Sequence, residues 1–175
     1  MDIQGTTIGI RTYRRNDTEA FCKAVLESTK HLKPFMPWCH ENYSLAESDT
    51  WITSRLQRWE QQLEYSFIIY SLLNNELIGS VDINQINTTH KTGNIGYWIR
   101  KKYLNQGIAT NAVKLISEFG FNTLKLRRLE IVMLTNNLAS KKVAEKAGGH
   151  FEGRLRNRLL VNGCSLDAFI YSIIN

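Results

Sequence analysis

The sequence predicts an α+β or mixed α/β protein, built on a mostly antiparallel, twisted sheet of about seven strands with helices against it. Three observations support this prediction. Short apolar stretches lie between turn residues, segments with helical spacing separate them, and the pair Asn162-Gly163 marks a hairpin near the end of the chain. This order of elements is typical of a layered sheet.

The chain has 175 residues, of which 43% are hydrophobic and 22% are charged. That is enough to bury one sizeable core, so we expect a single domain over residues 1–175. No apolar run approaches the roughly 20 residues that cross a bilayer, and the first residues lack the apolar region of a signal peptide. We therefore expect a cytoplasmic protein without membrane contact.

Cysteine and charge content narrow the classes of partner. The three cysteines, Cys22, Cys39 and Cys164, lie far apart, which favours neither a disulfide framework nor a zinc site, and we expect no metal. The formal net charge of +6 favours an anionic partner. Nucleic acid, a phosphorylated cofactor and an acidic protein all satisfy that condition, so charge alone does not choose among them.

The N-terminal part predicts a short strand followed by a helix. Ile8 and Ile10 alternate with polar residues, as in a strand. Asn16 and Glu19 have the spacing of a helix cap, and the helix that starts there is expected to run to about Glu27.

A second helix follows an irregular segment. The segment HLKPFMPWCHENYS contains Pro34 and Pro37, which interrupt regular structure. Ser44 and Glu47 resemble another capping pair, which opens a polar helix to about Leu63.

The middle of the chain predicts an antiparallel meander. Its strands are Tyr65–Leu73, Glu76–Ile83 and Gly93–Arg100, and Asn74-Asn75 suits a tight turn between the first two. After a loop, apolar residues recur at helical spacing from Ala112 to Phe119. The remaining elements are a strand at Arg128–Leu134, a short helix from Asn137 to Ala147 that Gly148-Gly149 ends, and the final hairpin.

The loop before the long C-terminal helix is the first candidate site. Residues Asn105 to Thr110, with the sequence NQGIAT, are small or flexible around Gly107 and precede a helix N-terminus. Convergent backbone N–H groups at such a point favour phosphate. Neither the lysine-containing nucleotide loop nor the three-glycine dinucleotide loop is present. A diphosphate held by the main chain fits what remains, with Arg100, Lys101 and Lys102 adding positive charge.

These residues resemble a known family. The stretch GYWIRKKYLNQGIATNAV is similar to motif A of the GNAT superfamily of acyl-CoA-dependent N-acetyltransferases, and LEIVMLTNNLASKKVAEKAGGHFEGRLR resembles the motif that follows it. HLKPFMPW is similar to the aromatic segment of the RimJ/RimL-like branch, which acetylates ribosomal-protein N-termini. The matches come in the family's order and cover nearly the whole chain.

Three positions depart from the family pattern. Leu104 stands where the general motif has Gln or Arg, and Asn105 replaces a glycine that is customary in this branch. Gly149 replaces the usual phenylalanine after the short helix, so another residue, such as Phe151, is expected to supply the packing there.

The resemblance implies acetyl-CoA as co-substrate and a set of site residues. A main-chain N–H near Trp98 or Ile99 would polarise the acetyl carbonyl, Asn137 would bind the pantetheine arm, and the Ser140 hydroxyl would protonate the departing thiolate. Phe35, Met36, Trp38 and Trp98 would line the acceptor groove. The expected cofactor-binding residues are Trp98, Ile99, Arg100, Asn105, Gln106, Gly107, Ile108, Ala109, Thr110, Asn137 and Ser140, with Ser140 and Ile99 as the catalytic ones.

Acetyl transfer requires a neutral amine. An α-amine with a pKa of about 7.7–8.0 is partly neutral near pH 7, whereas a lysine with a pKa near 10.4 is almost wholly charged. A protein N-terminus, attacking directly in a ternary complex, is therefore the preferred acceptor, and Glu41 and Asp82 are open as candidate general bases.

Two alternatives to this acceptor stay open. The same chemistry could serve a polyamine, an aminoglycoside or a toxic aminoacyl compound. A non-catalytic module that binds RNA or a ribosome is a weaker alternative, because the aromatic and basic signatures of an RNA-binding sheet are missing and no direct nucleic-acid contact is expected. The histidines at positions 31, 40, 90 and 150 lack ligand spacing and are expected as surface or packing residues, and relatives in this branch allow a homodimer.

Overall fold

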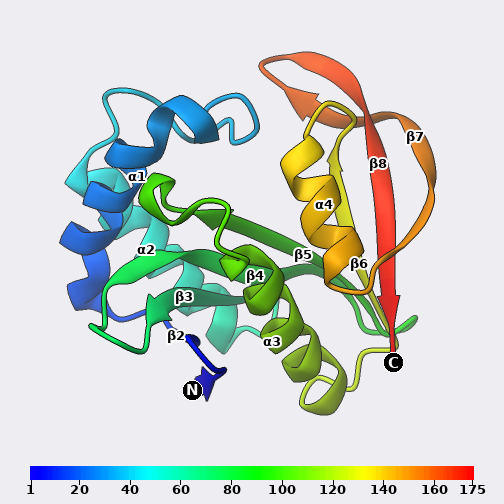
Figure 1. The fold of residues 1–175 in the computed structure, drawn as a ribbon, viewed down its shortest axis with the longest axis horizontal. Helices are drawn as coiled ribbons and strands as arrows, with labels where there is room; N and C mark the ends of the chain where they lie inside the picture. The colour runs from blue at the N-terminus through cyan, green and yellow to red at the C-terminus, as the bar shows by residue number, and fades with distance from the viewer.

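The computed structural model describes the whole chain, Met1–Asn175. It contains one open sheet of eight strands, in the order β1-β2-β3-β4-β5-β6-β8-β7, and four helices (Figure 1). All neighbouring strands are antiparallel except β5 and β6, which run parallel. The strands are β1 (Asp2–Gln4), β2 (Ile8–Thr12), β3 (Tyr65–Ser71), β4 (Leu77–Asn87), β5 (Thr92–Ile99), β6 (Arg128–Leu134), β7 (His150–Val161) and β8 (Cys164–Ile174). The helices are α1 (Thr18–Leu32), α2 (Leu45–Glu60), α3 (Ile108–Asn122) and α4 (Leu138–Lys146).

Helices cover both faces of the sheet. One core contains residues of α3 and α4, such as Ile116 and Ala144, packed on alternate residues of the central strands. The other contains residues of α1 and α2, such as Phe21 and Ile52, packed on the opposite face. Because successive strand residues point to opposite faces, the neighbours Tyr97 and Trp98 belong to different cores. Side chains on opposite faces of the sheet therefore cannot pack in the same core.

The predicted fold class is confirmed, and the strand count differs by one. The additional strand is β1, whose three residues pair with β2 through Ile3 and Ile10. A strand this short leaves no readable alternation in the sequence. None of the four helices combines the length and apolarity that crossing a bilayer demands.

The first helix begins and ends later than predicted. Asn16 and Glu19 form no cap; instead, the Asp17 carboxylate accepts from the Arg14 amide at 2.7 Å and from the Arg11 guanidinium. The helix continues past Glu27 to Leu32 and ends shortly before Pro34, which has no N–H group to continue the helical hydrogen bonds.

The second cap and the final hairpin are confirmed. The Glu47 amide donates to Ser44 Oγ at 3.3 Å while the Glu47 carboxylate accepts from the Ser44 amide at 2.9 Å. Asn162 and Gly163 both have positive φ, at 49° and 78°, as a two-residue hairpin turn requires. The helix from Ser44 ends at Glu60, short of the predicted Leu63.

Phe151 supplies the packing that Gly149 does not. The Phe151 ring lies 5.4 Å from that of Phe169 and 5.2 Å from that of Tyr171. A Cβ at Gly149 would come within 2.9 Å of the Ala144 carbonyl oxygen. The chain thus needs a glycine at this close approach and recovers aromatic packing two residues later.

Candidate functional site

The parallel strands β5 and β6 separate after a short paired segment. Pairing is limited to Thr92 with Arg128, Gly93 with Leu129 and Asn94 with Glu130. Beyond these pairs β5 continues to Ile99 and β6 continues to Leu134 without facing ladder bonds. Unpaired backbone groups at the inner edges of this split need other partners.

The edge of β5 that faces the split carries the Ile99 amide. The Arg100 amide donates to the Ile78 carbonyl at 2.7 Å, and amides of successive strand residues point to opposite edges. The amides of Tyr97 and Ile99 therefore point away from β4 and into the split, whereas that of Trp98 points toward β4. Of the two amides expected to polarise a carbonyl, only that of Ile99 has the right direction.

His31 bonds to this same edge of β5. Its Nε2 lies 2.9 Å from the Ile99 carbonyl oxygen, and because a carbonyl only accepts, Nε2 carries the proton. Its Nδ1 is buried without a partner. The sequence suggested only a surface or packing role, since no motif marks a histidine that bonds to a strand distant in the chain.

The loop before α3 presents six consecutive unbonded amides. The backbone N–H groups of residues 105–110 donate to no acceptor within the protein. Asn105 and Gly107 have positive φ, at 62° and 74°, and a Cβ at Gly107 would meet nothing within 4 Å. Turns of this kind direct successive N–H groups to one point, at a helix N-terminus whose dipole favours an anion. The loop thus has the geometry of an anion-binding nest.

Of the three basic residues expected to add positive charge beside the loop, Arg100 and Lys102 pair with carboxylates, whereas Lys101 has no ion-pair partner. The Arg100 side chain is 6% exposed and forms ion pairs with Glu27 at 2.6 Å and with Glu76 at 2.7 Å. Glu76 also contacts Lys102 and Tyr103, and these hydrogen bonds hold its pKa at about 2. The Arg100 charge is thus already offset by two glutamates, and a cofactor contact of Arg100 stays a prediction.

The start of α4 brings two predicted residues to the split. Asn137 Oδ1 accepts from the Ser140 amide at 3.1 Å, so Asn137 is the N-cap of this helix. The Ser140 hydroxyl lies 2.7 Å from the hydroxyl of Tyr97, which extends from β5. Burial raises the pKa of Tyr97 to about 12, so this phenol stays protonated near neutral pH. Tyr97 was missing from the predicted site because its position in a strand gave no sign of this contact.

An aromatic cluster covers the opposite face of β5. Trp38 lies 6.3 Å from Trp98 and 5.4 Å from Trp51, measured between ring centroids. The indole N–H groups of Trp51 and Trp98 are buried without acceptors. Of the predicted acceptor residues, Met36, Trp38 and Trp98 meet in this cluster, while Phe35 is half-buried and lies in neither core.

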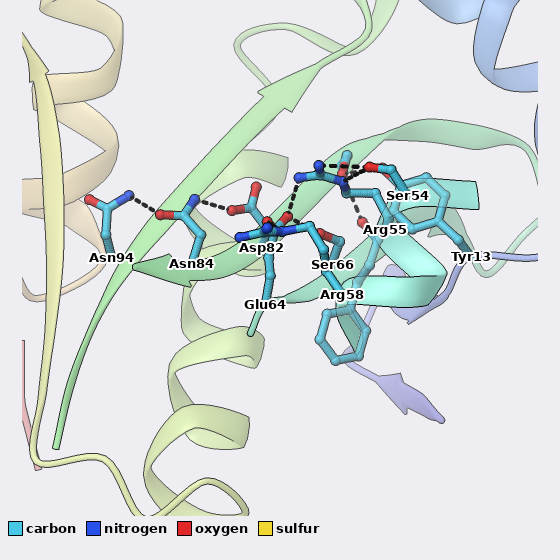
Figure 2. A network of polar contacts seen from close by, with 11 residues as sticks. Tyr13, Ser54, Arg55, Arg58, Glu64, Ser66, Asp82, Asn84 and Asn94 are labelled. Atoms are coloured by element: carbon cyan, nitrogen blue, oxygen red, sulfur yellow. Dashed lines mark hydrogen bonds and ion pairs between the residues drawn. The ribbon is translucent and has the colours of Figure 1, made fainter. Parts of the chain in front are cut away.

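A polar network crosses β3, β4 and β5 on the same face (Figure 2). Asn94 donates to Asn84 at 3.0 Å, and Asn84 donates to the Asp82 carboxylate. Glu64, immediately before β3, accepts from Arg55 at 2.6 Å and from Arg58 at 2.8 Å, both on α2. Alternating polar residues within a buried strand were the available sequence signal for this network.

The two candidate bases have different surroundings. Glu41 is 77% exposed and pairs with Lys33 at 3.2 Å on the surface. Asp82 is half-buried within the polar network, and burial, aided by the nearby Glu64 carboxylate, raises its pKa from 3.8 to about 7.

Comparisons with known proteins point to the same family as the sequence motifs. Residues 7–150 match the family model described as Acetyltransferase (GNAT) domain. The protein named "Probable N-acetyltransferase YjcK" from Bacillus subtilis (strain 168) is 33% identical over 175 residues, covering 99% of this chain and 97% of that protein. The ribosomal-protein-serine acetyltransferase of Escherichia coli (strain K12) is 24% identical over 168 residues, covering 96% and 93% of the two chains.

A solved structure shows the same fold. The ribosomal L7/L12 α-N-protein acetyltransferase RimL, in complex with coenzyme A, has a TM-score of 0.90 at 23% identity, covering 99% of this chain and 98% of that chain.

Replacing Arg100 tests its structural role. The change Arg100→Met removes charge-assisted hydrogen bonds to Glu27 and Glu76, and we expect the free energy of unfolding in urea to fall by about 2–3 kcal/mol. Coenzyme A affinity of the folded variant, measured by calorimetry, should stay within about twofold. An unchanged stability combined with a tenfold loss of affinity would instead assign the guanidinium to the phosphates.

Replacing Asp82 tests its raised pKa. A carboxyl whose folded pKa of about 7 lies above its ordinary 3.8 stabilises the fold fully only below pH 4 and loses that contribution as pH rises through 7. We expect Asp82→Asn to be more stable relative to the wild type at pH 8 than at pH 5, as measured by urea unfolding. The surface variant Glu41→Gln serves as control, and an equal difference at both pH values contradicts the assignment.

Proposed function

Since the chain belongs to the GNAT acetyltransferase family and is an acetyl-CoA-dependent N-acetyltransferase, we propose that its acceptor is the N-terminal α-amine of a protein. The amine attacks directly while both substrates are bound, without a covalent enzyme intermediate. The observation that carries the site assignment is the row of six unbonded amides at residues 105–110, beside the split between β5 and β6.

The loop suits the diphosphate of coenzyme A. Six N–H donors at a helix N-terminus offer hydrogen bonds to several phosphate oxygens without a lysine side chain. The open space over Gly107 lets phosphate approach the backbone. From there the pantetheine arm would extend along β5, where the Asn137 Nδ2 group is a further donor, because only Oδ1 of that side chain caps α4.

The split between β5 and β6 provides groups for the attack on the acetyl carbonyl and for the departure of the thiolate. The Ile99 amide would donate to the acetyl carbonyl oxygen, where negative charge develops as the nitrogen attacks. The carbon–sulfur bond then breaks, and the Ser140 hydroxyl would give its proton to the departing thiolate. Tyr97 orients this hydroxyl through their 2.7 Å contact. A helix cap and a proton donor thus share the first turn of α4.

Three features support an α-amine acceptor. Such an amine has a pKa of about 7.7–8.0 and needs little deprotonation near pH 7. The aromatic cluster of Trp38, Trp51 and Trp98 provides apolar contact for the first side chains of a peptide. The names of the E. coli relative and of RimL describe ribosomal-protein acetyltransferases.

Replacing Gly107 tests the phosphate site. The change Gly107→Glu places a bulky negative group where the diphosphate would lie, and we expect the Kd for acetyl-CoA to rise at least about tenfold by calorimetry. Gly163→Glu is a matched control, because Gly163 has a similar φ of 78° and the same open surroundings on the hairpin. If both variants bind acetyl-CoA like the wild type, the loop is not the phosphate site.

A panel of amines tests the acceptor, with free thiol release as the readout. We expect turnover with a peptide that has a free α-amine. The same peptide with a blocked N-terminus and an internal lysine should react on the order of a hundredfold more slowly at pH 7, because its neutral fraction is that much smaller. Turnover confined to spermidine or an aminoglycoside would replace the protein acceptor and leave acetyl transfer in place.

A further inference from the structure

Two carboxylates of the polar network have unequal partners. Glu64 receives both arginines of α2, with Arg55 at 2.6 Å and Arg58 at 2.8 Å, and the hydroxyl of Ser66 at 2.6 Å. Asp82 receives only the neutral amide of Asn84, on its Oδ1 (Figure 2). No protein group donates to Asp82 Oδ2, which is also not among the sealed, unpartnered polar atoms. Asp82 is thus a carboxylate without a cation and with one oxygen open to a further donor.

Asp82 lies over the strand that borders the split. Its residue partner on β5 is Gly96, and a Cβ at that position would come within 2.9 Å of Asp82 Oδ2 and 3.1 Å of Oδ1. The carboxylate therefore occupies the space that a side chain of residue 96 would take. Gly96 lies two residues after Asn94, the last β5 residue that pairs with β6. The Asp82 carboxylate is therefore next to the start of the split.

Asp82 lies between the aromatic cluster and the split between β5 and β6. Asp82, Ser80 and Asn84 are alternate residues of β4 and share a face with Trp98 of the aromatic cluster, because Ser80 is the partner of Trp98. The Ile99 amide lies on the edge of the same β5 strand. An amine between the cluster and the split would approach this carboxylate.

We propose that the Asp82 carboxylate is the general base that takes a proton from the acceptor ammonium, directly or through one water molecule. The inference rests on the proposed function and adds to it the residue that prepares the nucleophile. Glu41, the other candidate from the sequence, is excluded from this role by its exposed position and its pairing with Lys33.

The proton balance of the step is complete. Asp82 takes one proton from the ammonium group, and the neutral nitrogen forms the carbon–nitrogen bond as the carbon–sulfur bond breaks. The second nitrogen proton replaces the one that Ser140 gives to the thiolate. Asp82 then releases its proton to water, so the products are the acetylated amine, the free thiol of coenzyme A and one proton.

Burial is the largest cause of the raised pKa of Asp82, and its charged neighbours modify that pKa. The Glu64 carboxylate raises the pKa, Arg55 of α2 opposes it, and β5 contributes only the neutral Asn94 and Gly96 opposite. The resulting pKa of about 7 is within about one unit of the pKa of an α-amine and more than three units below that of a lysine. Proton transfer is therefore nearly balanced for an N-terminal amine and unfavourable for an alkyl amine, which selects the same acceptor class.

The test compares Asp82→Asn with the wild type from pH 6 to pH 9.5, using a free α-amine peptide at saturating acetyl-CoA. At pH 6.5 an α-amine is neutral to only about 3–6%, whereas a carboxyl of pKa 7 is ionised to about a quarter. We expect the variant to be at least about tenfold slower at pH 6.5, because a positioned general base typically contributes about 10²–10⁴-fold to the rate, and to approach the wild-type rate above pH 9, where the acceptor is already neutral. A merely structural loss would lower the rate equally at every pH.

Two further measurements complement the pH profile. In the wild type, the carbon-13 resonance of the Asp82 carboxyl, identified by its absence from Asp82→Asn, should titrate near pH 7, and Glu41→Gln should leave it and the pH profile unchanged. Gly96→Ala, which places a Cβ against the carboxylate, should displace that titration and slow the reaction at pH 6.5.

The outcomes separate this inference from the proposed function. If the wild type binds acetyl-CoA and acetylates the peptide but Asp82→Asn keeps its rate at pH 6.5, Asp82 is not the base. A carboxyl that titrates near 4 overturns the inference in the same way. If calorimetry finds no binding of acetyl-CoA to the wild type, the proposed function fails and the role of Asp82 fails with it.

Discussion

The parting of β5 from β6 is the constraint on which the rest of the site depends. Parallel pairing ends at Asn94 and Glu130, and each strand continues alone. The amides of Tyr97 and Ile99 on the inner edge consequently lack ladder partners, while β4 satisfies the other edge of β5. A sheet that stayed paired to the end would have used these groups for its own stability, and the opening for a thioester arm would not exist.

The basic side chains that approach the site mostly serve the fold. Arg100 joins Glu27 to Glu76, and Arg55 and Arg58 hold Glu64, so the charges of these three arginines are offset by carboxylates. Buried arginines need such partners, because an unpaired buried charge is costly. In the proposed site, anion recognition would rely on oriented backbone amides, which require no side-chain ordering.

In the proposed site, several groups would serve the fold and the chemistry at once. Asn137 caps α4 with its oxygen while its nitrogen stays available, and Ser140 receives that cap through its backbone while its hydroxyl meets Tyr97. The arginines that pair with Glu64 leave Asp82 without an ion-pair partner, so burial and the Glu64 carboxylate raise the pKa of Asp82 while Arg55 opposes them only in part. Two neighbouring carboxylates of which only one has cationic partners differ in their protonation behaviour.

Local patterns in the sequence were sufficient for most elements, for the loop at Gly107 and for the cap pair Ser44 and Glu47, because turn residues, caps and periodicity act over a few neighbouring positions. They failed for β1, which is too short to show a period. Tertiary structure alone decided the direction of the Ile99 amide, since this depends on which strand lies on each side of β5. It also decided contacts between distant residues, such as Arg100 with Glu27, which are 73 positions apart and whose pairing no local spacing encodes.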